Sequence, residues 1–203
     1  MPGENLTHAE ARARAALLDV ESYDVELDLT TGPETFGSTT TVRFAAGAGE
    51  STFIDLIAAQ VHEVELNGRA LGPEVVSDAR IALGDLAAEN ILRVVASCPY
   101  MHTGEGLHRF VDPVDDEVYL YTQFEVPDSR RVFAVFEQPD LKATFRFTVT
   151  APAHWTVVSN SPTPESEPSG EAARWAFEPT PRLPSYVTAI VAGPYHRETG
   201  ELT

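Results

Sequence analysis

Short runs in which apolar and polar side chains alternate recur along this chain and restrict it to a fold built from β-sheets. Residues 19–31 show the pattern well, since Val25, Leu27 and Leu29 alternate with acidic side chains. Successive side chains of a strand point to opposite faces of its sheet, so this spacing is typical of a half-buried strand. The same pattern predicts further strands at residues 35–45, 51–57, 61–66, 80–83, 90–97, 118–125, 141–150, 155–159, 172–177 and 186–192.

Turn signals separate these runs and leave one long irregular stretch. Asn67-Gly68 is a typical two-residue hairpin turn. Residues 100–116 lack regular patterning and predict a long loop, which in a compact domain is often functional. Neither a linker nor an internal repeat divides the sequence. We therefore predict a single domain over residues 1–203, all-β, an antiparallel β-sandwich or saddle with one N-terminal helix and a short helical turn.

The predicted helix lies close to the N-terminus. Thr7 followed by Glu10 three residues later is the signature of a capping box, and the Ala- and Arg-rich run that follows predicts a helix to Leu18. Because alanine dominates its apolar side, we expect this helix to bury little area. Residues 1–6 are expected to form a flexible tail.

The composition narrows the classes of partner. The chain carries 31 acidic against 14 basic side chains, a formal net charge of −17. Nucleic acids and anionic membranes are bound by clustered Lys and Arg, so we expect neither as a partner. The single cysteine, Cys98, is expected to be a buried thiol. Neither a basic leader with an apolar core nor a run of about 18 apolar residues occurs, so a cytoplasmic location is expected.

Residues 121–147 are the most informative segment, and they open as the end of a strand. The period of two places Gln123 and Glu125 on one face of that strand, with Tyr121 beside them. A carboxylate and an amide at the end of a strand suit the binding of a small cation such as an amine. The alternative is a solvated strand face beside a packing turn.

Two prolines bound the turn that follows. Pro127 is expected to end the strand, and Asp128 to cap a short helical turn over residues 129–136. The turn carries two arginines, Arg130 and Arg131, and we expect at least one of them to pin it by pairing with a nearby carboxylate. The candidate carboxylates are Asp128, Glu137 and Asp140.

Complete catalytic sets are missing from the sequence. Zinc peptidases with the His-Glu-x-x-His motif use two histidines one helical turn apart. Residues 62–66 (HEVEL) lack the second histidine and lie in a predicted strand, so we interpret them as a chance match. His102 and His108 share a loop, with a surface or capping role as the favoured interpretation. Neither Gly-x-Ser-x-Gly nor a Gly-rich phosphate loop occurs. We therefore predict no catalytic and no metal-binding residue in this chain.

Several short motifs carry a resemblance to a known family. They are residues 106–110 (GLHRF), 122–125 (TQFE), 130–131 (RR), 136–145 (FEQPDLKATF), 159–160 (SN) and 185–187 (SYV). Together, over roughly residues 20–195, the chain resembles the N-terminal domain of the aminopeptidase N family of zinc metallopeptidases. One departure is Glu137-Gln138, since the family usually shows Asp-Glu before the proline.

The resemblance implies a role in substrate recognition. It implies the N-terminal domain of a zinc-dependent aminopeptidase that removes N-terminal amino acids from peptides. In that family the Gln and Glu of the TQFE-like segment reach into the active site. By resemblance, Glu125 would bind the α-ammonium of the substrate, and Gln123 would line the pocket for the first side chain. The implied partners are a peptide N-terminus and the catalytic domain of the same polypeptide, which would bind the zinc.

The family's catalytic motifs, Gly-Ala-Met-Glu-Asn and His-Glu-x-x-His, do not occur in these 203 residues. We therefore expect an N-terminal domain without its catalytic domain. Such an N-terminal domain would hold no zinc and would not hydrolyse peptides alone. The alternative interpretation is a stand-alone acidic β-sandwich that binds a partner and has no enzymatic role. In that case Glu125 would be an ordinary solvated acid.

Overall fold

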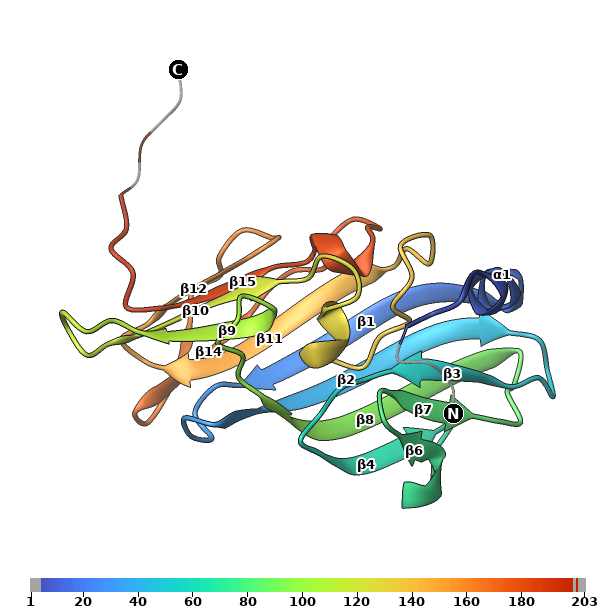
Figure 1. The fold of residues 1–203 in the computed structure, drawn as a ribbon. Coiled ribbons are helices and arrows are strands. Elements are labelled where there is room, and N and C mark those ends of the chain that lie inside the picture. The colour runs from blue at the N-terminus through green and yellow to red at the C-terminus, as the bar shows by residue number, and fades with distance from the viewer. Residues whose placement is uncertain (1–4, 199, 201–203) are drawn as a thin grey trace.

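The computed structural model describes residues 5–198 and residue 200, and strands dominate this part of the chain (Figure 1). The large sheet has eight strands, in the spatial order β13 (Glu167–Ser169), β14 (Ala172–Ala176), β11 (Thr144–Pro152), β1 (Leu18–Asp28), β2 (Thr35–Ala46), β8 (Glu89–Pro99), β4 (Gln60–Leu66) and β5 (Arg69–Ala70). The small sheet has four, in the order β12 (Thr156–Ser159), β15 (Ile190–Gly193), β10 (Val118–Gln123) and β9 (Gly106–Val111). A three-stranded sheet contains β3 (Thr52–Asp55), β7 (Arg80–Leu83) and β6 (Val76–Ser77).

Few helical elements accompany the sheets. The described residues contain one α-helix, α1 (His8–Leu17), and three 3-10 turns, η1 (Pro73–Val75), η2 (Ser129–Arg131) and η3 (Ser185–Val187). The prediction of an all-β fold with one N-terminal helix is confirmed. In Figure 1 the small sheet and the three-stranded sheet are seen at opposite ends of the large sheet.

The strands of the large sheet pair antiparallel, with one exception. β1 pairs with β2 antiparallel from Leu18↔Ala46 to Asp28↔Gly37, but it pairs with β11 in parallel, beginning at Ser22↔Thr144. A parallel pair needs a long crossover instead of a tight turn, and here most of the chain lies between the two strands. Local patterning contains no signal for such a distant pairing, so the wholly antiparallel sheet that the sequence predicts needs this correction.

Aromatic rings fill the space beneath the large sheet and attach the segment after β10 to it. Tyr23 of β1 stacks on Phe145 of β11 with ring centroids 4.7 Å apart. Phe133, which follows η2, contacts Phe145 at 6.1 Å and Phe147 at 5.9 Å, and it is completely buried. Rings in edge-to-face contact stabilise a core beyond their buried area alone. The turn after β10 is therefore anchored in the core by the packing of Phe133.

The structure corrects the prediction of a long irregular loop at residues 100–116. Within this stretch lies β9, which pairs with β10 from Val118↔Val111 to Gln123↔Gly106. At the far end of β9, Phe110 and Val111 are more than 40% exposed, so the burial of its side chains does not alternate. The period-two signal is therefore weak, although the backbone pairing is regular.

Helix α1 has the predicted cap and, as expected, buries little of its surface, with one exception. The Thr7 side chain accepts a hydrogen bond from the Glu10 N–H, and the Glu10 carboxylate accepts one from the Thr7 N–H. Arg14, however, is only 2% exposed, because its guanidinium enters the protein interior. The Ala-rich sequence of the helix does not predict the burial of Arg14, because a charged side chain is normally expected at the surface.

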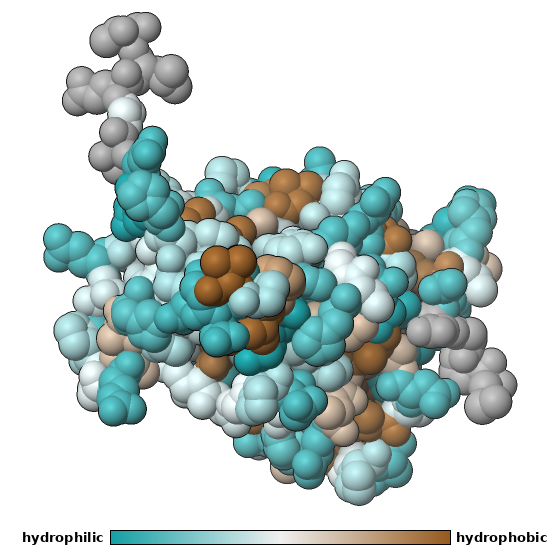
Figure 2. All heavy atoms as spheres, turned by 60° about the vertical axis from the view of Figure 1, so that its left-hand side comes forward, coloured by the Kyte–Doolittle hydropathy of each residue, from teal (hydrophilic) through white to brown (hydrophobic). Residues whose placement is uncertain are grey.

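The surface of the domain carries mainly polar side chains on the face that Figure 2 shows. Hydrophobic side chains appear on this face as separate spots. Among the described residues, no helix has the length and apolar character needed to span a membrane.

Candidate functional site

The residues predicted to bind an amine lie where β10 ends. Gln123 is the last residue of the strand, and strand alternation places it on the same face as Tyr121, which is 41% exposed. Glu125 lies two residues beyond the strand, in a turn over residues 125–128 that includes the cis peptide Val126-Pro127. The predicted strand is thus two residues too long, and Glu125 is placed by the turn.

A hydrogen bond and a buried ring fix the backbone at this point. The Glu125 N–H donates to the Gln123 side-chain Oε1 at 3.1 Å, so the two candidate residues are directly linked. Between them, Phe124 is 3% exposed and packs edge-on against Phe133, with ring centroids 5.8 Å apart. The Glu125 carboxylate stays exposed while the chain on which it stands is held by the core.

Glu137 joins the turn after β10 to the chain near residue 185. Its carboxylate accepts hydrogen bonds from the Ser129 hydroxyl, from the Arg130 N–H at 2.8 Å and from the Ser185 hydroxyl at 2.9 Å. Glu137 is 4% exposed, and burial raises the pKa of its carboxyl, an effect that the three donors oppose. This carboxylate therefore holds η2 and η3 together in the interior.

A second buried cluster ties helix α1 to the same turn. The Arg14 Nη1 donates to Asp55 Oδ2 at 2.7 Å, and the Arg14 Nε donates to Gln138 Oε1 at 3.1 Å. The Asp55 carboxylate also accepts the Glu137 N–H at 3.1 Å, and the Gln138 side chain donates to the Ala11 carbonyl at 2.9 Å. Glu137-Gln138, the departure from the family pattern, is thus a buried and fully engaged pair.

The predicted arginine pairing of the turn is confirmed for Arg131. Its Nε donates to Asp128 Oδ1 at 2.7 Å, and its guanidinium also reaches Glu105 at 3.3 Å. The Asp128 side chain makes no capping hydrogen bond to η2, so its predicted capping role is wrong, because the carboxylate binds Arg131 instead. The helical turn itself spans only Ser129–Arg131, which is shorter than the predicted residues 129–136.

His102, in the loop before β9, and His108, within β9, come close to the candidate site but are engaged in local contacts. The His102 and His108 rings lie 6.5 Å apart, and His108 also lies 4.8 Å from the Tyr121 ring. His102 Nδ1 hydrogen-bonds the Arg109 carbonyl, and His108 Nδ1 accepts the Gly104 N–H. These contacts hold the loop against β10, beside Gln123.

The remaining candidate metal ligands and nucleophiles of the chain have structural roles. Within residues 5–198 and residue 200, no three or more His, Cys, Asp or Glu side chains gather in a way that suits a metal ion. His62 bonds Ser97 across the large sheet. Cys98 is completely buried, and burial raises the pKa of its thiol to about 12, as expected for an unreactive cysteine.

Comparison with known proteins identifies the family. A model of the Peptidase M1 N-terminal domain matches residues 98–187. Aminopeptidase N of Streptomyces lividans is 67% identical over 202 residues, which cover 97% of this chain. The chain belongs to the N-terminal domain of the M1 aminopeptidase family. Aminopeptidase N of Acetobacter pasteurianus is 39% identical over 111 residues, and a probable aminopeptidase 1 of Sulfurisphaera tokodaii is 24% identical over 185 residues.

The chain corresponds to only part of these relatives. It spans 23% of the Streptomyces lividans protein, 30% of the Acetobacter pasteurianus protein and 23% of the Sulfurisphaera tokodaii protein. The matched family segment runs from the end of β8 to η3 and includes Gln123, Glu125 and Glu137.

The sequence analysis of this M1 domain named the exposed Glu125 and the buried Glu137, but it missed the buried ion pair of Arg14 and Asp55. Asp55 and Arg14 lie far apart in the sequence, and only the packing of α1 against β3 brings them together. Ser185 lies in a quoted family motif, which was the one available signal for its contact with Glu137.

Proposed function

We propose that this chain is the substrate-recognition domain of a zinc-dependent aminopeptidase, in which Glu125 binds the free α-ammonium of a peptide. The observation that carries the proposal is the placement of Glu125. An exposed carboxylate lies directly beyond the end of β10. Its backbone is held by the buried Phe124 on one side and, on the other, by the turn that is anchored in the core. An enzyme that removes N-terminal residues must recognise an ammonium, and a rigidly held carboxylate binds one through charge-assisted hydrogen bonds.

Gln123 is proposed to line the pocket for the first side chain of the peptide. Its Oε1 accepts the Glu125 N–H, and this bond fixes the orientation of the amide. Its remaining N–H donors have no acceptor among the described residues, so they are available to a bound peptide or to a neighbouring domain. Tyr121 and His108, whose rings contact each other at 4.8 Å, form the adjacent surface.

Zinc and the hydrolytic step are proposed to belong to another part of a longer protein. The side chains in the described part of the chain do not fit a zinc site, because they include no suitable group of three His, Cys, Asp or Glu. The length of the aminopeptidase relatives, of which this chain spans 23% in the Streptomyces lividans case, supports the assignment of catalysis to a separate domain. The N-terminal domain itself would contribute one wall of the active-site cleft.

The test is a kinetic comparison in the full-length protein. Glu125→Gln keeps the size of the side chain and removes its charge, so it is expected to lower kcat/KM about 10- to 100-fold on an aminoacyl arylamide. Glu89→Gln, at the start of β8 in the large sheet, is the control for the loss of one surface charge. Zinc content and melting temperature should match the wild type in both variants. Unchanged kinetics in Glu125→Gln would remove the basis for the assignment.

A further inference from the structure

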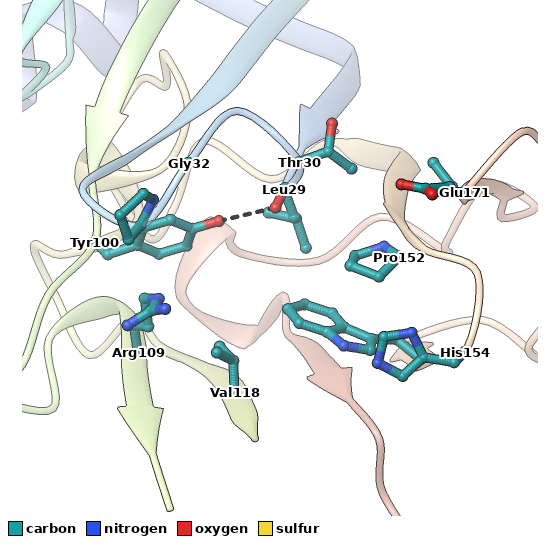
Figure 3. Close-up of a pocket in the computed structure, with 12 residues that line it drawn as sticks. Leu29, Thr30, Gly32, Tyr100, Arg109, Val118, Pro152, His154 and Glu171 are labelled. Atoms are coloured by element: carbon teal, nitrogen blue, oxygen red, sulfur yellow. Dashed lines mark hydrogen bonds between the residues drawn. The ribbon is translucent and has the colours of Figure 1, made fainter. Parts of the chain in front are cut away.

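An open cavity of about 600 Å³ lies at the opposite end of β10 from Glu125. Figure 3 shows residues that line it. The cavity is bounded by the ends of strands from both the large and the small sheet, and its walls include Leu29, Tyr100, Arg109, Val118, Pro152 and Trp155. Val118 begins β10 and Gln123 ends it, so the cavity and the amine site are about 17 Å apart along the strand. The cavity is therefore separate from the proposed substrate site.

Neutral apolar and aromatic groups make up most of the wall. Leu29, Val118 and Pro152 contribute aliphatic surface, and Tyr100 and Trp155 contribute rings. Tyr100 is only 6% exposed, and burial raises the pKa of its phenol, so this ring stays uncharged at physiological pH. A concave, mainly apolar wall with few polar groups is the usual composition of a small-molecule site, and the volume lies in the usual range.

Arg109 is the one arginine of this wall, which also includes Glu171 and His154. Its guanidinium lies near the Tyr100 ring, 6.0 Å from the centroid, and the side chain is half-buried. Within residues 5–198 and residue 200, no carboxylate forms an ion pair with it, although the chain has 31 acidic residues against 14 basic ones. By contrast, the buried Arg14 and the partly buried Arg131 both pair with acids.

The position of Arg109 also differs from that of other unpaired arginines. Four other arginines form no ion pair with a described acid, and all four are exposed: Arg12, Arg43, Arg69 and Arg197. Water satisfies an exposed guanidinium at no cost, whereas partial burial without a counter-ion is unfavourable unless an anion completes the arrangement. Arg109 is thus a half-buried cation at the wall of the cavity, without a carboxylate partner among the described residues, and it is placed to pair with an anion there.

We propose that this cavity binds a small organic carboxylate with an aromatic or branched aliphatic body. The carboxylate pairs with the Arg109 guanidinium, whose planar fork matches two carboxylate oxygens. The apolar body lies between Tyr100 and Trp155. Figure 3 shows Glu171 at the side of the cavity opposite Arg109. An acid there disfavours a second negative charge, so the site selects monocarboxylates over dicarboxylates.

The test is direct binding to the full-length protein by isothermal titration calorimetry. The probes are 3-phenylpropionate and its neutral analogue 3-phenylpropionamide, which has the same shape and lacks the charge. The wild type is expected to bind the carboxylate at least about tenfold more tightly than the amide. Equal affinity for both probes, or no saturable binding of the carboxylate, overturns the proposal without the use of any variant.

Two variants assign the binding to this cavity and not to a peptidase active site. Arg109→Gln is expected to abolish the preference for the carboxylate over the amide. Arg43→Gln removes one exposed arginine from β2 and is expected to keep that preference. Both variants are checked for a cooperative thermal transition. A preference that survives in folded Arg109→Gln places the ligand elsewhere and contradicts the proposal.

Discussion

Replacement of Arg14 by methionine is expected to destabilise the fold more than any surface change of similar size. Arg14 and Asp55 are 2% and 3% exposed in their side chains and lie 2.7 Å apart. Methionine fills much of the space but leaves the Asp55 carboxylate buried, with the Glu137 N–H as its remaining donor. Loss of one partner of a buried ion pair costs about 3–5 kcal/mol in the free energy of unfolding.

The assay is equilibrium unfolding in urea near neutral pH, with Arg93→Met as the matched control. Arg93 pairs with Glu63, but both side chains are more than 40% exposed, so this substitution should cost less than about 1 kcal/mol. A double variant that also carries Asp55→Asn removes the unpaired buried charge. It should therefore be less destabilised than the sum of the two single variants. If Arg14→Met costs no more than Arg93→Met, the buried cluster does not fasten α1 to the turn.

Two further predictions concern backbone conformation and pH. Gly106 has φ +57°, and a Cβ there would lie 2.8 Å from the Arg131 Cβ, so Gly106→Ala should cost about 1–3 kcal/mol in unfolding free energy. Gly170→Ala, at φ +64° with open space around it, should cost less in the same urea assay, and equal costs would exclude the clash. A hydrogen bond from Arg80 lowers the pKa of Glu10 from 4.5 to about 2. The ionised Glu10 carboxylate therefore stabilises the folded state fully above pH 4.5, and this stabilisation disappears as the pH falls toward 2. The stability difference between the wild type and Glu10→Gln should shrink over that window in urea titrations, and a constant difference would contradict the pairing.

The parts of the fold that follow from neighbouring residues could be read from the sequence. The capping box of α1, the hairpin turn at Asn67-Gly68 and the strand Arg80–Leu83 all depend on residues a few positions apart. Each of these signals has a local physical cause, such as an unpaired helix N–H or the left-handed conformation of Asn67. The structure confirms all three.

Features that depend on distant pairing could not be read in the same way. The parallel pairing of β1 with β11 is set by a partner far along the chain. β9 pairs with its neighbour β10, but the burial of its side chains does not alternate, so the sequence carried no strand signal there. Arg14 gives no local indication of its buried counter-ion. The candidate residues Gln123 and Glu125 came from a motif resemblance, since strand alternation alone also fits a solvated face. Arg109 lies in the motif GLHRF (residues 106–110), but nothing in the sequence indicated its cavity, because that cavity forms where two sheets meet.

The most direct test of the central claim measures how the Glu125 carboxylate responds to the ligand's amine. In the full-length protein, the inhibition constant of an amino-acid hydroxamate is compared with that of its des-amino analogue, in the wild type and in Glu125→Gln. We predict that the wild type prefers the amine-bearing inhibitor by about 10- to 100-fold and that Glu125→Gln loses most of this preference. The same preference in both proteins would show that another group recognises the ammonium and would contradict the proposed role of this domain.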